Sequence, residues 1–341
     1  MWQKMDKKYM IWLGWVLFLG GLLIAAGILA LAMGPASIPL AKIPALLWGK
    51  EPGIEASILR EVRLPRLLLG FAVGGALSVS GVILQGMFRN PLVEPYTLGI
   101  SGGAALGVCL AIVGKLNRWL GIFSLPLSGF AGAVLVIYLV YFLSLKKGVV
   151  KIQGLLLTGV MISFISSSLI MLFMAVSRVE DLHGIIFWTL GSLSETNWTL
   201  VGIALLTSVL GLLVSYFFCF DLNAFSLGEE EALHLGVNIE RDKRILFLLA
   251  SVLTGLSVSF SGIIGFVGLV VPHLVRMLVG PDHRILLAAS FLLGAGFLIL
   301  CDTLARTIIA PMELPVGVIT GILGGGIFIY ALAKSELISG K

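Results

Sequence analysis

The sequence predicts an all-α, polytopic membrane protein. Of its 341 residues, 58% are hydrophobic and only 12% are charged, whereas a soluble domain carries about 25% charged residues. Mean hydropathy is +1.08. Uncharged runs of roughly 20 residues recur along the chain, and a helix of that length crosses the hydrocarbon core of a bilayer. We therefore expect one transmembrane domain over residues 1–341, with about ten helices.

The predicted spans follow apolar runs that carry no charge. Eight runs fit one helix each: Met10–Met33, Leu67–Phe88, Tyr96–Gly114, Trp119–Leu145, Leu155–Val176, Trp198–Phe220, Ile285–Cys301 and Leu314–Ala333. A further stretch, Ile245–Gly280, is too long for one helix. Because glycines interrupt it, we expect two spans with a tight turn near Gly262–Gly265. This gives ten spans, although hydropathy alone also permits nine.

The first run is expected to remain in the mature protein. Met10–Met33 contains 24 residues without a charge, whereas the apolar core of a signal peptide is about 7–15 residues long. The run is long enough to span the bilayer, and we interpret it as the first transmembrane helix.

The charge pattern indicates a protein that is embedded in a lipid bilayer, not one that binds nucleic acid. The formal net charge is +5, but the Lys and Arg residues lie in short gaps between apolar runs. Such basic loops orient membrane proteins, because positive charge is retained in the cytoplasm. With ten spans and cytoplasmic N- and C-termini, most Lys and Arg residues fall on the inner side.

The sequence contains no pattern of a catalytic or metal site. Cys109, Cys219 and Cys301 lie far apart in or beside apolar runs, and the four histidines lack metal-ligand spacing. There is no HExxH or GxxxxGK[ST] motif. We therefore expect a chain that is not an enzyme and binds no cofactor. If ATP drives it, ATP and Mg²⁺ must bind a separate polypeptide.

Two polar segments lie between predicted spans. Residues 34–66 carry several prolines and charges, and they are expected on the outer side. Residues 221–244 carry a dense set of acidic and basic residues and are expected in the cytoplasm. The second segment is too charged to enter lipid, but its leucines give it an apolar side. It could therefore form short helices under the membrane.

Several short motifs along the chain together resemble one transporter family. They are Arg63–Arg66 (RLPR), Arg89–Pro95 (RNPLVEP), Leu98–Ala104 (LGISGGA), Leu155–Val160 (LLLTGV), Trp188–Leu193 (WTLGSL), Leu227–Ala232 (LGEEEA), Leu235–Val237 (LGV), Gly262–His273 (GIIGFVGLVVPH), Asp302–Arg306 (DTLAR) and Glu313–Gly317 (ELPVG). In this order they are similar to the FecCD family of ATP-binding-cassette permeases, which import iron siderophores, haem and cobalamin.

The resemblance implies a FecCD-type fold with about ten helices in each subunit. It implies two permease subunits, most simply a homodimer, with the substrate path between them. Two ATP-binding-cassette ATPases would dock on the cytoplasmic face and a substrate-binding protein on the outer face. The location would be the cytoplasmic (inner) membrane of a bacterium or archaeon. A siderophore is the first expectation for the cargo, and haem or cobalamin follows.

The resemblance also assigns roles to individual residues. The ATPase-coupling residues would be Leu227, Gly228, Glu229, Glu230, Ala232, Leu235 and Gly236. The alternative is a solvated loop. Arg63, Arg66 and Arg306 would receive acidic residues of the binding protein, or else they would anchor helix ends by extending to the interface. Asn90, Pro91 and Leu92 would form the inner gate, or else a structural turn.

One predicted helix carries a face of hydroxyl groups. Ser163, Ser166 and Ser167 could line the path, although serines also pack helices together.

The competing function is an ion-coupled secondary transporter. Such proteins place ionisable residues at mid-membrane, and these runs are almost free of them.

Overall fold

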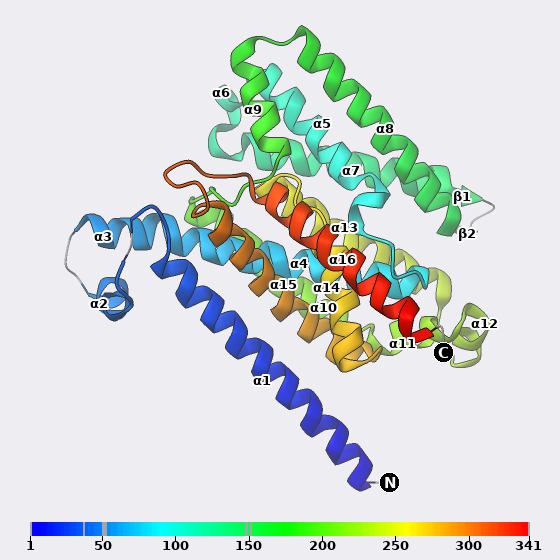
Figure 1. Cartoon of the computed structure of the whole chain (residues 1–341). Helices are drawn as coiled ribbons and strands as arrows, with labels where there is room; N and C mark the ends of the chain where they lie inside the picture. The colour runs from blue at the N-terminus through cyan, green and yellow to red at the C-terminus, as the bar shows by residue number, and fades with distance from the viewer. Residues whose placement is uncertain (1, 37, 50–52, 147–148, 151, 340–341) are drawn as a thin grey trace.

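The computed structural model describes residues 2–36, 38–49, 53–146, 149–150 and 152–339 (Figure 1). In this part of the chain the fold is helical except for one antiparallel pair of two-residue strands, β1 (Leu145–Lys146) and β2 (Val149–Val150). The predicted all-α class is therefore confirmed.

Seven helical stretches in the described ranges are long and apolar enough to cross a membrane. They contain α1 (Trp2–Ala32), α4 (Leu64–Phe88), α7 (Ser124–Ser144), α8 (Ile152–Val176), α10 (Trp198–Tyr216), α13 (Ile239–Ser261) and α15 (His283–Ala305). Helices α5 (Ile100–Val113) and α14 (Val267–Val279) are apolar but shorter, and α16 (Val316–Ser339) has a shorter apolar stretch over Val316–Ala331. A multi-pass fold is thus shown, whereas ten crossings stay a prediction.

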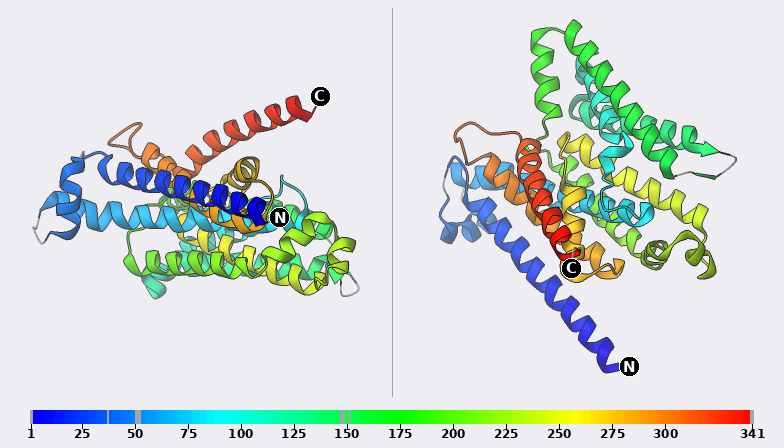
Figure 2. Two further views of the ribbon diagram at one scale, coloured as in Figure 1. Left: turned by 90° about the horizontal axis from the view of Figure 1, so that it is seen from below. Right: turned by 45° about the vertical axis from the view of Figure 1, so that its right-hand side comes forward.

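Helix α4 is the centre of the bundle. Its most apolar window is 83% buried, compared with 22% in α1 and 17% in α8. Figure 1 shows α1 along one edge of the bundle and α8 along the opposite edge, and the turned views of Figure 2 keep this arrangement. Glycines let α4 approach its neighbours: a Cβ on Gly81 would overlap the carbonyl of Gly268 in α14. Small residues have this role at membrane helix interfaces.

The predicted turn in Ile245–Gly280 is confirmed. Helix α13 ends at Ser261 and α14 begins at Val267. Gly262 and Phe266 have φ of +68°, a left-handed conformation that suits glycine and is uncommon for phenylalanine. The helix therefore breaks at both ends of a short irregular segment, residues 262–266.

Both polar segments contain short helices, which the sequence predicted only for residues 221–244. In the outer segment, η1 (Leu40–Lys42) and α2 (Ile43–Trp48) come first. Then α3 (Ile54–Ser57) and the π-helical turn η2 (Ile58–Arg63) run continuously into α4. The segment 221–244 contains most of α11 (Cys219–Leu227) and all of α12 (Glu229–His234). Its last six residues, 239–244, already belong to α13.

Three further elements connect the spans. Helix α6 (Asn117–Leu120) and the turn η4 (Gly121–Phe123) lead into α7, and η3 (Pro95–Leu98) leads into α5. Helix α9 (Val179–Thr189) was not predicted. It precedes the non-helical connection 190–197, which leads to α10.

Candidate functional site

Helices α11 and α12 form a pair of short helices at one end of the bundle (Figure 1). Leu227 and Leu235 are 62% and 50% exposed, whereas Ala232 between them is fully buried. Glu229 and Glu230 are exposed. The pair therefore exposes leucine and acidic side chains, while the buried Ala232 lies on the side that packs against the bundle.

Sharp turns and one ion pair fix the shape of this helix pair. Gly228 and Gly236 have φ of +140° and +84°, values that side chains with a Cβ rarely adopt. Glu229 lies 2.8 Å from Nζ of Lys243 in α13. A rigid, exposed unit of this kind can receive force from a soluble partner.

Asn223 connects α11 to the beginning of α15. Its Oδ1 accepts hydrogen bonds from the backbone N–H and the Nδ1 of His283, both at 2.9 Å. Its Nδ2 donates to Asp282 Oδ1 at 3.2 Å. Lys8 of α1 lies 3.0 Å from the other oxygen of Asp282. Three helices thus meet at one polar cluster.

The predicted gate segment is an exposed turn. Arg89 has φ of +52° and ends α4. Asn90 Oδ1 accepts a hydrogen bond from the backbone N–H of Leu92 at 2.9 Å, which is an Asx turn. Leu92 is 54% exposed, and Pro91 is exposed too. This geometry suits a turn, and gating by these three residues stays a prediction.

The continuation of this segment is attached to the α13–α14 break. Tyr96 Oη donates to the carbonyl of Ile264 at 2.7 Å and accepts from its N–H at 3.2 Å. The Glu94 carboxylate accepts from the backbone N–H of Phe266. Gln85 Nε2 donates to the carbonyls of Gly268 and Leu269 at 3.3 and 3.2 Å. These hydrogen bonds satisfy backbone N–H and C=O groups that lose their helical partners at the break. Such pairing is needed because unpaired backbone groups are costly inside a membrane.

The three arginines predicted to receive a binding protein are buried instead of presented outward. Arg63, Arg66 and Arg306 are 3%, 4% and 5% exposed. Arg63 donates to the carbonyls of Leu31 and Ala32 at 2.6 and 3.0 Å. All three have partners inside the chain, so the structure gives them a role in holding helix ends together. Contact with a binding protein stays a prediction.

Two of these arginines form ion pairs with carboxylates. Arg66 Nε lies 2.8 Å from Asp302 Oδ1, and its Nη1 lies 2.7 Å from Glu313. Arg306 lies 3.4 Å from the second oxygen of Asp302 and also donates to the carbonyl of Ala30. Asp302, which lies in α15 just beyond the predicted span Ile285–Cys301, is therefore neutralised by two guanidinium groups.

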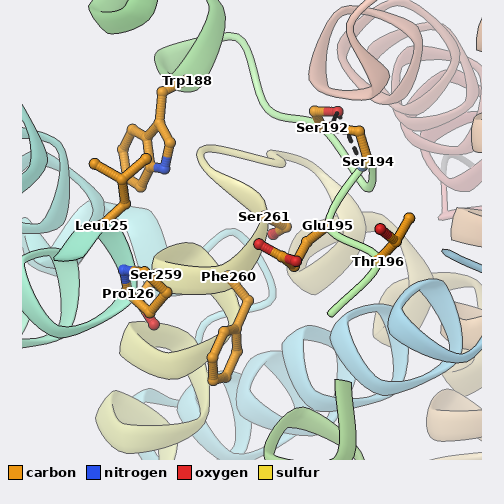
Figure 3. A pocket seen from close by; sticks show the side chains of 10 residues that line it. All are labelled: Leu125, Pro126, Trp188, Ser192, Ser194, Glu195, Thr196, Ser259, Phe260 and Ser261. Carbon is orange, nitrogen blue, oxygen red and sulfur yellow. Dashed lines mark hydrogen bonds between the residues drawn. The ribbon is translucent and has the colours of Figure 1, made fainter. Parts of the chain in front are cut away.

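A polar cavity of about 240 Å³ lies between the start of α7, the end of α13 and the 190–197 connection (Figure 3). Hydroxyl groups of Ser192 and Ser194 lie 2.9 Å apart on its wall. In Figure 3 the Glu195 side chain extends among the side chains that line it, and its Oε1 accepts from the N–H of Asn197 at 2.8 Å. The cavity can hold water or small polar groups.

A second cavity of about 380 Å³ also borders the 190–197 connection. It shares Trp188, Ser192 and Ser194 with the first cavity and adds Glu313 and Pro315. The second cavity lies near the Arg66–Asp302 cluster, because Glu313 lines this cavity and also pairs with Arg66. Sequence reasoning did not single out this connection as a site.

The three serines of α8 divide into two environments. Ser163 donates to the carbonyl of Gly159 at 3.0 Å, and Ser166 is 2% exposed. A Cβ on Gly102 of α5 would lie 3.3 Å from Ser166, so these two serines pack α8 against α5. Ser167 is exposed. Their lining of a path stays a prediction.

Sequence reasoning missed the residues that join distant elements. Asn223, Tyr96 and Asp282 were not assigned roles, although each is a polar residue at the end of an apolar run. Asp302 was predicted only as the first residue of the motif Asp302–Arg306. Within the described ranges no group of three or more His, Cys, Asp and Glu side chains could hold a metal ion.

The fold and these sites define a multi-pass membrane protein with a rigid pair of short helices outside its spans. The chain belongs to the FecCD transport family, whose model matches residues 22–334. The predicted family is therefore confirmed over most of the chain.

Characterised relatives carry several different cargoes. The hemin transport system permease protein HmuU of Yersinia pestis is 42% identical over 330 residues, covering 94% of this chain and 96% of the relative. The Fe(3+) dicitrate transport system permease protein FecD of Escherichia coli is 40% identical over 320 residues, covering 94% and 98%. The cobalamin import system permease protein BtuC of Halobacterium salinarum is 40% identical over 286 residues, covering 84% and 76%.

A solved structure has the same fold. It is described as an inward-facing conformation of a metal-chelate type ABC transporter, and it matches with a TM-score of 0.83 and 31% sequence identity. The match covers 95% of this chain and 99% of the solved chain. The architecture of the bundle is therefore that of an ABC transporter permease.

Proposed function

We propose that this chain is the permease subunit of an ATP-binding-cassette importer that carries an iron chelate. A siderophore is the first candidate cargo, and haem or cobalamin follows, since relatives named for haem, ferric dicitrate and cobalamin are similarly close. The chain itself would form the path, and separate ATPases would bind ATP and Mg²⁺.

The observation that carries this proposal is the exposed α11–α12 pair. Leu227, Leu233 and Leu235 are 50–62% exposed on helices that are too short to span lipid. Large apolar side chains gathered outside the spans indicate a protein contact. We assign this surface, with Glu229 and Glu230 beside it, to the ATPase, and we place it in the cytoplasm together with both termini.

Force applied at this surface has a direct route into the bundle. Asn223 joins α11 to the first residues of α15, and Lys243 joins Glu229 of α12 to α13. We propose two copies of the chain, two ATPases and one substrate-binding protein on the opposite face. Closure of the ATPases would then tilt α13 and α15 and change which side of the path is open.

The ion-coupled alternative receives less support from the structure. A proton- or sodium-coupled carrier needs an ionisable group at membrane depth that gains and loses its charge. The buried carboxylate of Asp302 lies near the end of α15, and Arg66 and Arg306 both lie against it. This pairing suits a structural tie that keeps its charge.

Reconstituted uptake tests the proposal. The full chain, its ATPase and its binding protein are placed in liposomes, and accumulation of a ferric hydroxamate, ferric dicitrate, haem and cobalamin is measured with and without internal ATP. The proposal predicts ATP-dependent accumulation of at least one of these chelates. Accumulation of none, with a folded and assembled complex, would refute it.

A further inference from the structure

A cavity of about 370 Å³ lies where the gate segment meets the α11–α12 end of the bundle. Its lining includes Gln85, Arg89, Asn90, Ser226, Arg276 and His283. Five structural elements contribute to its wall: the end of α4, the turn after it, helix α11, and the adjoining ends of α14 and α15. Its volume is within the usual range of small-ligand sites.

The charge of this cavity is positive. Arg89 and Arg276 are in its lining, and no acidic side chain is. Within the described part of the chain, neither guanidinium forms an ion pair. Arg276 Nη2 donates to Gln85 Oε1 at 3.1 Å, which leaves its other N–H groups for a ligand. Arg89 is exposed.

One buried nitrogen in the wall lacks a partner. His283 is 2% exposed, and its Nε2 makes no hydrogen bond. A buried polar atom without a partner is costly and calls for a ligand or water. Gly86 leaves the space beside it, because a Cβ there would lie 2.7 Å from Nε2.

The bonds of Asn223 fix the chemistry of this nitrogen. Asn223 Nδ2 donates to the Asp282 carboxylate, so its Oδ1 is the atom that faces His283 and accepts from Nδ1. Nδ1 therefore carries a proton. In the neutral imidazole, Nε2 then accepts a hydrogen bond. The complementary ligand offers anionic oxygens to the two arginines and a hydroxyl to Nε2.

We propose that the cavity between Arg89, Arg276 and His283 binds a phosphate-type anion that also carries a hydroxyl group. Guanidinium groups bind phosphate oxygens through charge-assisted, often paired hydrogen bonds. Two sources share this chemistry: free hydrogen phosphate, and the headgroup of phosphatidylglycerol with its phosphodiester and glycerol hydroxyls. The site does not depend on which cargo the permease carries.

The position of the site gives the anion a structural consequence. Ser226 belongs to α11 and Asn90 belongs to the gate segment, and both line the same cavity. A bound anion would therefore connect the ATPase-facing helix pair to the turn after α4 through the two arginines.

Binding to the purified full chain tests the proposal. In nanodiscs of phosphatidylcholine, inorganic phosphate is titrated by calorimetry at neutral pH, with sulfate as an anion that has no hydroxyl. In nanodiscs that also contain phosphatidylglycerol, lipid retained by the chain is measured by native mass spectrometry. Tighter phosphate than sulfate binding identifies the free ion as ligand, and retained phosphatidylglycerol identifies the lipid. Either result supports the site.

Matched variants decide whether the binding is at this cavity. R89Q and R276Q are each expected to weaken phosphate binding or lipid retention at least about ten-fold, since each removes charge-assisted hydrogen bonds. R241Q removes an exposed arginine of α13 outside the cavity and should change nothing. Arg89 is exposed, so R89Q keeps the test valid if R276Q fails to fold. Absence of phosphate and lipid binding in the wild type, or equal loss in R241Q, would overturn the proposal.

Discussion

Arg66 and Asp302 form a buried ion pair between α4 and α15, with Nε of Arg66 at 2.8 Å from Oδ1 and 3.0 Å from Oδ2. The two residues are 236 positions apart in the sequence, and each side chain is only 5% exposed. Removing one partner of such a pair leaves an uncompensated charge in a site that excludes water. The pair therefore specifies how the two central helices meet.

Replacement of Arg66 tests this tie. R66A should destabilise the protein by about 3–5 kcal/mol, because it leaves the carboxylates of Asp302 and Glu313 without their shared partner. The measurement is the thermal unfolding midpoint in one detergent. The Lys42–Glu55 pair is the control, since its side chains are 57% and 47% exposed. K42A should cost less than about 1 kcal/mol, and equal losses would contradict the assignment.

The Tyr96 hydroxyl is predicted to hold the gate segment against the helix break. Y96F keeps the ring but removes both bonds to Ile264, so one backbone N–H and one carbonyl lose their partner. We expect a loss of about 1–3 kcal/mol of stability and slower ATP-driven uptake. Y330F alters a tyrosine that is 69% exposed and serves as the control. Unchanged unfolding and uptake in Y96F would show that the contact is unimportant.

The leucines of the α11–α12 pair are predicted to bind the ATPase. The double variant L227S/L235S should weaken ATPase binding by at least about ten-fold, since burying two leucines contributes several kcal/mol, while the unfolding midpoint stays the same. The readout is the dissociation constant of the complex in detergent. Leu40 is 59% exposed in the outer segment, so L40S should leave the dissociation constant unchanged. Normal ATPase binding by the double variant would remove this surface from the interface.

We expect the free energy of unfolding to depend on pH through the carboxyl group of Asp282. Burial alone would raise the pKa of Asp282, but hydrogen bonds from Lys8, from the Arg284 N–H and from Asn223 outweigh it and lower the pKa. A lowered carboxyl pKa contributes stability above the unfolded value, and the contribution is lost as pH falls through the folded pKa. D282N should therefore be less stable than the wild type at pH 7, by about 1 kcal/mol.

The same comparison at low pH checks the sign. The difference in unfolding midpoint between wild type and D282N should shrink as pH falls below about 3.9, the ordinary value of an aspartate. A difference that grows toward acid would mean that the carboxylate is not the stabilising form.

Hydropathy and turn residues predicted much of this fold. Apolar runs located the long spans, and the glycines at 262 and 265 located the break between α13 and α14. The charge density of 221–244 placed short helices outside the lipid. Helix α9 was missed because Glu180, Asp181 and His183 interrupt its apolar pattern, so that it resembles a polar connection.

The sites were harder to predict, because their residues meet only through the fold. Arg66 lies at the end of a run, where an extended arginine at the interface is the simplest interpretation. Its partner Asp302 belongs to a helix near the other end of the chain. Periodicity and composition contain no information about such pairings. The same holds for Asn223 with His283, which join α11 to α15.

We expect this chain to form only the path, and we expect energy to enter through separate proteins that bind α11 and α12. The most direct test measures chelate accumulation in sealed liposomes that contain the chain alone, under imposed proton and sodium gradients, beside liposomes that also contain the ATPase, ATP and the binding protein. We expect accumulation in the second set only. Accumulation or nucleotide hydrolysis by the chain alone would contradict it.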